Sequence, residues 1–261
     1  MASSMVHYIV SRFVARELGV GDLNMFLVGS VLAPDTGNKE DGSYCKLHYM
    51  DIREEIGRKG FNWRTFIDEH ADKMHEDYYK GYCCHLIMDA LWFHDICNKH
   101  IRHLPKDIKA EKIQAVYRDY WRLNHLLIMQ YNVPNEPIKV VNVPDAEIIT
   151  DNLINMAESF EKQLHAPECN LDDLEILTWN IMTDYVGKAK ELCLKEMSAI
   201  INGGDRMDVL SLFVSLDHYI IIVNKVLREN LWLQKSVKGI RCLMPYMYQA
   251  TNWVVMELPN R

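Results

Sequence analysis

The residues with the clearest chemical potential lie in a mostly apolar stretch, GYCCHLIMDALWFHD, at positions 81–95. This stretch carries two imidazoles and two carboxylates, at His85, Asp89, His94 and Asp95. His85 and Asp89 are four residues apart, so on a helix they share one face. Side chains placed in this way either hold one cation between them or hydrogen-bond to each other as a simple helix-stabilising pair. Because a buried carboxylate without a partner is costly, we expect Asp89 to be paired or metal-bound.

Three more groups of the same kinds precede this stretch in apolar surroundings. His7 lies in the N-terminal segment, Asp35 ends the segment FLVGSVLAPD, and His48 lies in KLHYMD. Imidazole nitrogens and carboxylate oxygens are the ligands that suit Zn²⁺ and related divalent ions. Three histidines and two aspartates can hold two ions if one aspartate bridges them. A single histidine on an apolar helix is more often a core residue, so none of these segments assigns a site by itself.

Taken in order, these segments resemble the zinc-dependent phospholipase C family. The family pattern has an early His, a Gly-Ser segment that ends in Pro-Asp, a His-Phe or His-Tyr pair, and G-Y-x-x-H-x-x-x-D. This chain has His7, GSVLAPD, HY and GYCCHLIMD in that order, over residues 7–89. More distantly, the pattern is similar to that of the fungal zinc single-strand nucleases, which share the fold. The resemblance implies an all-α, multi-helix bundle and a cytosolic member of bacterial type.

The resemblance also implies a role for each matching residue. The central metal site would take Asp35, His48, His85 and Asp89. His7 would bind a second ion, with Asp89 bridging the two, and Asp35 would orient or deprotonate the attacking water as the catalytic residue.

A third metal position is not expected from the sequence. His94 follows Asp89 by five residues and is a candidate ligand, although the family has its next histidine six residues on. The family also uses a later histidine with an acid four residues further, but His125 is followed by Met129 and His218 by Ile222. We therefore expect one or two Zn²⁺ ions, or another divalent metal.

Such a site predicts hydrolysis of phosphate esters. A bound Zn²⁺ lowers the pKa of its water toward about 7 and stabilises charge on phosphate oxygens. The expected reaction is a phospholipase C-like phosphodiesterase reaction in which metal-activated water is the nucleophile. The expected substrate is a small phosphate ester, a nucleotide or a phospholipid.

Two functions of other classes remain open. One is a non-catalytic helical protein with a structural metal site, whose closed coordination leaves no position for water or substrate. The other is a metal-free helical interaction module. It predicts that His85 and Asp89 pair with each other while His7, Asp35 and His48 lie elsewhere.

The elements that must position these residues are almost all helical. Ser3 and Ser4 can cap a first helix that Gly19 and Gly21 end. The other expected helices cover residues 22–33, 62–80, 81–95, 108–131, 145–165, 171–201 and 207–235. Residues 34–60 are expected to be a loop, and residues 132–144, with three prolines, an extended connection.

We expect one all-α domain over residues 1–261. Residues 1–131 would form the half that carries the metal site, and residues 145–261 would add long helices. The only strand pattern is IKVVNV, at 138–143. On the helix over 108–131, Asp119 and Asn124 could supply a polar contact to the site, but a solvated helix face is the favoured expectation for both.

Composition limits the possible partners. The 261 residues are 49% hydrophobic and have a formal net charge of −7, so the chain can bury a large core and no stable nucleic-acid binding is expected. We expect no transmembrane segment, because no apolar run approaches about 18 residues. Seven cysteines without a C-x-x-C pair, and no signal-peptide pattern, favour a cytoplasmic protein with reduced thiols.

Overall fold

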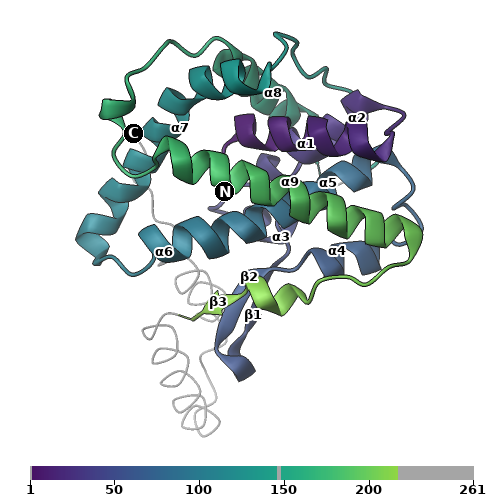
Figure 1. Ribbon diagram of the computed structural model, residues 1–261. Coiled ribbons are helices and arrows are strands. Elements are labelled where there is room, and N and C mark those ends of the chain that lie inside the picture. Colours follow the sequence, from purple (N-terminus) through teal and green to yellow (C-terminus); the bar gives the residue numbers. More distant parts are fainter. Residues whose placement is uncertain (1, 146–147, 217–261) are drawn as a thin grey trace, which may run out of the picture. The chain divides into compact units, whose positions relative to one another are not determined.

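The computed structural model describes residues 2–145 and 148–216, and helices predominate within them (Figure 1). The α-helices are α1 (Ser4–Leu18), α2 (Leu23–Leu27), α3 (Ser43–Leu47), α4 (Trp63–Glu69), α5 (Asp77–Trp92), α6 (Asn98–His100), α7 (Lys106–Tyr131), α8 (Thr150–Leu164) and α9 (Trp179–Asn202). Two π-helical segments, η1 (Val28–Leu32) and η4 (Phe93–Cys97), continue α2 and α5. Short 3₁₀ turns are η2 (Pro34–Thr36), η3 (Glu54–Ile56), η5 (Leu171–Asp173) and η6 (Val209–Leu212). The mainly helical fold class is as expected, and none of the helices described here is long and apolar enough to cross a membrane.

The chain forms two compact units. The larger contains residues up to 51 and residues 60–213, so the helices on both sides of the proline-rich connection belong to it. Of the described residues, the smaller contains 52–59 and 214–216. The strands β1 (Met50–Arg53), β2 (Arg58–Phe61) and β3 (Val214–Ser215) form a sheet in the order β1-β2-β3. In the smaller unit β2 and β3 are antiparallel, with Arg58 opposite Ser215.

Helix α1 begins and ends where its sequence predicts. The hydroxyl of Ser3 accepts a hydrogen bond from the backbone N–H of Val6, which is the usual N-cap contact. At the other end Gly19 takes a left-handed conformation with φ 65°, and its N–H donates to backbone carbonyls of the last turn. The inner face of α1 packs against α2, α5 and α9, and α9 crosses both α1 and α5 (Figure 1).

A close crossing of α5 with the α2–η1 segment sets the geometry of the first hundred residues. A Cβ on Gly29 would meet the carbonyl oxygen of Tyr78, and a Cβ on Gly81 would meet that of Phe26. Both positions therefore require glycine for steric reasons, because the two backbones touch there. The crossing fixes the register between η1 and α5.

The structure differs from the expected elements at several places. Residues 34–60 are not a plain loop, since they contain α3, β1 and β2. The helix expected over 62–80 ends at Glu69, where a series of turns leads into α5. Residues 138–143 form no strand. Of the helix expected over 207–235, the described part holds only η6 and β3, and the rest lies outside the described residues.

Candidate metal centre

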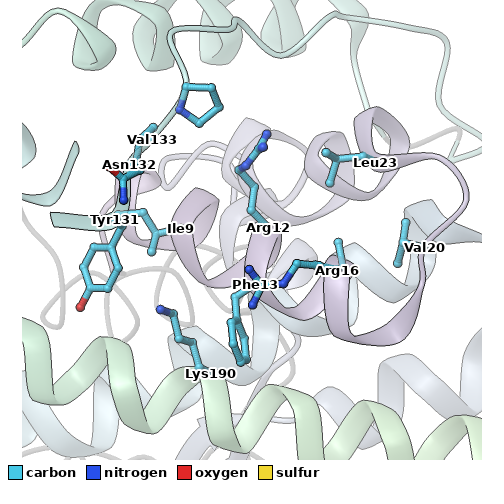
Figure 2. A pocket seen from close by; sticks show the side chains of 12 residues that line it. Ile9, Arg12, Phe13, Arg16, Val20, Leu23, Tyr131, Asn132, Val133 and Lys190 are labelled. Carbon is cyan, nitrogen blue, oxygen red and sulfur yellow. The ribbon is translucent and has the colours of Figure 1, made fainter. Parts of the chain in front are cut away.

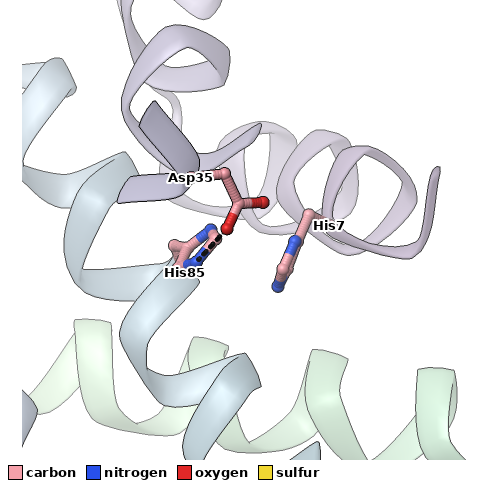
Figure 3. A group of neighbouring side chains, drawn as sticks. All are labelled: His7, Asp35 and His85. Carbon is pink, nitrogen blue, oxygen red and sulfur yellow. Dashed lines mark ion pairs between the residues drawn. The ribbon is translucent and has the colours of Figure 1, made fainter. Parts of the chain in front are cut away.

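Five sequence-predicted residues meet at one place inside the larger unit. His7 comes from α1, Asp35 from η2, His48 from the C-terminal end of α3, and His85 and Asp89 from α5. Figure 3 shows three of them, His7, Asp35 and His85, pointing toward one another from three segments. The histidine and Asp89 side chains are fully buried, while the Asp35 side chain is 10% exposed.

The donor atoms of His48, His85, Asp35 and Asp89 lie close together. The Nε2 atom of His48 lies 3.2 Å from Nε2 of His85, 3.3 Å from Oδ1 of Asp35 and 3.5 Å from Oδ2 of Asp89. The Nε2 atom of His85 lies 3.5 Å from the same Asp89 oxygen and 3.9 Å from the same Asp35 oxygen. Ligands at about 2.0–2.1 Å from a tetrahedral zinc ion are separated by about 3.3–3.4 Å. The donor atoms of His48, His85 and Asp89 therefore have about the spacing of zinc ligands, and Asp35 lies beside them, closest to His48.

Backbone carbonyls orient both imidazoles in the centre. The Nδ1 atom of His48 lies 2.9 Å from the carbonyl oxygen of Tyr44, and that of His85 lies 2.9 Å from the carbonyl oxygen of Ser30. A carbonyl oxygen can only accept a hydrogen bond, so each Nδ1 carries the proton. In the neutral ring Nε2 then presents a lone pair to the centre, which is the usual arrangement of metal-binding histidines.

His7 lies beside both Asp89 and His85, and its ring centroid is 4.2 Å from that of His85. Its Nε2 atom is 3.3 Å from Oδ1 of Asp89, the oxygen that does not face His48 and His85. The backbone N–H of Ala2 donates to the same oxygen at 2.9 Å. The two oxygens of Asp89 thus contact different side chains, Oδ1 that of His7 and Oδ2 those of His48 and His85. Both ring nitrogens of His7 lack a hydrogen-bond partner in the described part of the chain.

The electrostatics of the cluster favour a bound cation. Burial alone would raise the pKa of Asp89, but neighbouring positive charges and hydrogen bonds, those of His85 and His7 among them, hold it well below its usual range. The pKa of Asp35 is also lowered, by His48 and His85, in spite of its burial. Burial tends to lower the pKa of His85, yet Asp89 and Asp35 raise it overall. In contrast, burial and the neighbouring His85 lower the pKa of His7.

Two carboxylate oxygens at the centre lack a hydrogen-bond donor. Within the described residues, Oδ1 of Asp35 and Oδ2 of Asp89 are buried and accept no hydrogen bond. Buried carboxylate oxygens are costly unless they contact a donor or a cation. Both oxygens face the lone-pair nitrogens described above. The donor set therefore fits a divalent ion of the zinc type.

Two residues that the sequence analysis did not single out lie at the Asp35 side of the centre. The ring of Tyr44 stacks on His48 with a centroid separation of 4.0 Å, and its buried hydroxyl lacks a partner among the described residues. Lys39 is half-buried, with Nζ 5.4 Å from the centroid of the Tyr44 ring. Burial lowers the pKa of Lys39, and the charge of Asp35 opposes this shift only in part. The charged loop sequence around Lys39 gave no signal of this placement.

His94 does not join the five residues. It is partly exposed, and its Nδ1 atom lies 3.0 Å from Oδ1 of Asp95. Among the described residues, two sets of side chains have ligand atoms close enough to bind one metal ion. They are His7–Asp35–His85 and His48–His85–Asp89. His103 and Asp107 have the later four-residue spacing of the family pattern, which the sequence analysis missed, and both are exposed.

The expectation that Asp119 and Asn124 face solvent is wrong. Both side chains are buried. The Asp119 carboxylate accepts backbone hydrogen bonds from Glu175, Ile176 and Leu177 at 2.7–3.2 Å. It is a structural residue that fixes the segment before α9 onto α7.

Comparison of the chain with protein-family models, with curated proteins and with solved structures finds no match. The functional argument for this chain therefore depends on the geometry of the centre.

Proposed function

We propose that this chain is a cytoplasmic, metal-dependent hydrolase of phosphate esters, similar in chemistry to the zinc-dependent phospholipases C. The observation that carries the proposal is the convergence of His48, His85 and Asp89 at about the mutual distances of zinc ligands, with Asp35 3.3 Å from His48. The backbone carbonyls that fix both imidazoles support it, because such contacts are typical of metal-binding histidines.

Each residue has a distinct part in the proposed site. His48, His85, Asp35 and Asp89 would hold one ion, and His7 with the second oxygen of Asp89 would hold another. When bound, a zinc-type ion supplies Lewis acidity toward phosphoryl oxygen and activates water near neutral pH. Because Asp35 is the one member of the five with an exposed part, its carboxylate would orient the attacking water and accept its proton.

The surroundings of Asp35 suit a phosphate group. Lys39 brings a positive charge to this side of the centre, and Tyr44 brings a hydroxyl without a partner among the described residues. A cation and a hydrogen-bond donor beside a metal ion together stabilise the charge that develops on phosphate oxygens. Small phosphate esters, nucleotides and phospholipids all carry this group, and the proposal extends to all three classes.

A structural metal site is a second candidate. Four of the five side chains have no exposed surface, and a structural zinc site is closed to solvent in the same way. This candidate predicts tight metal binding and a large stabilisation of the fold without any hydrolysis.

The test is hydrolysis of p-nitrophenyl phosphate and bis(p-nitrophenyl) phosphate by zinc-loaded protein, before and after treatment with a chelator. The proposal predicts turnover that disappears with the metal and that Asp35→Asn reduces by about 10²–10⁴-fold. Zinc content is measured beside each rate, so that loss of the ion and loss of the carboxylate are separated. Lys39→Gln should raise KM and leave the zinc content unchanged.

The matched control is Asp68→Asn, which makes the same change at an exposed position on α4. Its rate should stay within about twofold of the wild type, as for most surface changes. Zinc-loaded protein that hydrolyses neither compound would contradict the hydrolase proposal and support the structural site.

A further inference from the structure

A second feature with binding chemistry is a pocket on the opposite face of α1 from His7. Its volume is about 780 Å³, within the range of small-molecule pockets. Figure 2 shows side chains around it from α1, from the α1–α2 connection and the start of α2, from the end of α7 and the segment after it, and from α9. The α1 residues Ile9, Arg12, Phe13 and Arg16 recur every three or four positions, so they form one helix face. None of the five residues of the metal centre lines this pocket.

The pocket wall carries positive charge without negative charge. Arg12, Arg16 and Lys190 line it, and no aspartate or glutamate does. Arg16 pairs with Glu17 at its exposed end. Arg12 and Lys190 form no ion pair with any carboxylate of residues 2–145 and 148–216. In a chain with a net charge of −7, this is an unusual local excess of cations.

The cationic side chains are held by aromatic and hydroxyl groups. Nη1 of Arg12 donates to the hydroxyl of Tyr8 at 3.2 Å. Nζ of Lys190 lies 4.4 Å from the centroid of the Tyr131 ring and 5.1 Å from that of Phe13. Cation–π contacts of this kind order a cation without neutralising its charge. Burial lowers the pKa of Lys190, and so does the like charge of Arg16.

Apart from Asn132 and Tyr131, the rest of the wall is apolar. Ile9, Val20, Leu23, Val133 and Pro134 contribute it, together with the ring of Phe13. An apolar wall with a few convergent polar groups is the usual composition of a small-molecule site. The cations select a ligand with negative charge, and the apolar wall selects a ligand that also has an apolar part.

We propose that this pocket binds an organic anion that has a phosphate, sulfonate or carboxylate head on an apolar body. The head contacts the positive charges of Lys190, Arg12 and Arg16. The body packs on Ile9, Leu23 and Val133. The proposal is independent of the metal centre, because the pocket and the centre share no residue.

The test is isothermal titration of chelator-treated protein with 2-naphthalenesulfonate, which carries both parts of the expected ligand. Neutral 2-naphthol has only the body, and sulfate has only the charge. The proposal predicts that 2-naphthalenesulfonate binds at least about tenfold more tightly than either, since each part adds a contact worth a factor of ten or more. Equal affinity for the sulfonate and the neutral naphthol, or no binding of the sulfonate at millimolar concentration, would overturn it.

Charge-removing variants locate the site. Lys190→Gln and Arg12→Gln should each weaken the binding of 2-naphthalenesulfonate by about tenfold or more. Lys188→Gln is the matched control, because Lys188 lies two residues away on α9, pairs with Asp95 and does not line the pocket. Lys188→Gln should bind 2-naphthalenesulfonate with the same affinity as the wild type. Equal weakening by Lys188→Gln and Lys190→Gln would show attraction by overall charge and contradict a site in this pocket.

Discussion

His48 and His85 direct their Nε2 atoms at each other across 3.2 Å, while each Nδ1 atom faces a backbone carbonyl oxygen at 2.9 Å. Two neutral imidazoles in this arrangement would bring two lone pairs together beside two carboxylates. The contact is favourable only when positive charge lies between the donor atoms, either as a proton or as a metal ion. This relationship is the physical basis of the proposed metal centre, and the predictions that follow depend on it or on the elements that maintain it.

Zinc should stabilise the folded chain. A ligand that binds only the native state adds about 2.7 kcal/mol at a hundredfold excess over its Kd. For a chain of this size that corresponds to a rise in Tm of about 5–10 °C. Thermal unfolding of chelator-treated protein with and without added Zn²⁺ measures the shift. His48→Gln should abolish most of it, and an unchanged shift in that variant would contradict the assignment of His48 as a ligand.

Gly81→Ala should destabilise the fold by about 3 kcal/mol or more, because the added methyl group would collide with the carbonyl of Phe26. The collision would push α5 away from the α2–η1 segment and move His85 from the Ser30 carbonyl. The comparison is Gly187→Ala on the exposed face of α9, where an added Cβ has nothing within 4 Å. That change should stabilise the protein by about 0.5–1 kcal/mol. Urea unfolding measures both variants, and similar effects of the two would refute the close crossing.

Asp119→Ala should cost about 3 kcal/mol of unfolding free energy. The change leaves the backbone N–H groups of Glu175, Ile176 and Leu177 without their acceptor. Asp184→Ala, an exposed position on α9, should stay within about 0.5 kcal/mol of the wild type. The midpoints of urea unfolding give both values. A loss below about 1 kcal/mol for Asp119→Ala would mean that the segment before α9 does not depend on this carboxylate.

Asp77 should make stability depend on pH in the acid range. Burial acts to raise its pKa, but Lys80 and the backbone N–H of Asp22 bring it below the ordinary value of 3.8. A carboxyl with a lowered folded-state pKa adds stability above its unfolded pKa and loses it as the pH falls through the folded value. The free energy of unfolding of the wild type should therefore exceed that of Asp77→Asn by about 1 kcal/mol at pH 6. This difference should disappear below pH 3.8. Urea midpoints across this range test it, and a gap that does not change with pH would contradict an ionic contribution.

The sequence singled out the five side chains that meet inside the larger unit, because their types and order are local information. The four-residue spacing of His85 and Asp89 places them on one face of α5, as expected from helix geometry. The N-cap Ser3 and the terminal Gly19 set the ends of α1 for equally local reasons. The convergence of His7, Asp35 and His48 on this face depends on tertiary packing, and the order of the motifs was the only sequence signal of it.

Long-range contacts explain what the sequence did not predict. Asp119 lies in a polar helical pattern, and only the backbone N–H groups more than fifty residues later explain its burial. The close crossing at Gly29 and Gly81 is likewise a contact between distant segments. β2 is a short, polar segment that pairs with residues more than 150 positions away, so its local pattern gave a loop. His94 lies one residue short of the family spacing, and its side chain pairs with the adjacent Asp95.

The most direct test of the metal centre is the zinc content of purified protein after loading and removal of free metal. Wild-type protein, Asp89→Ala and His94→Gln are compared by elemental analysis. The account predicts one or two zinc ions per wild-type chain, loss of the zinc in Asp89→Ala, and wild-type content in His94→Gln. Absence of zinc from the wild type, or equal zinc content in the wild type and Asp89→Ala, would contradict it.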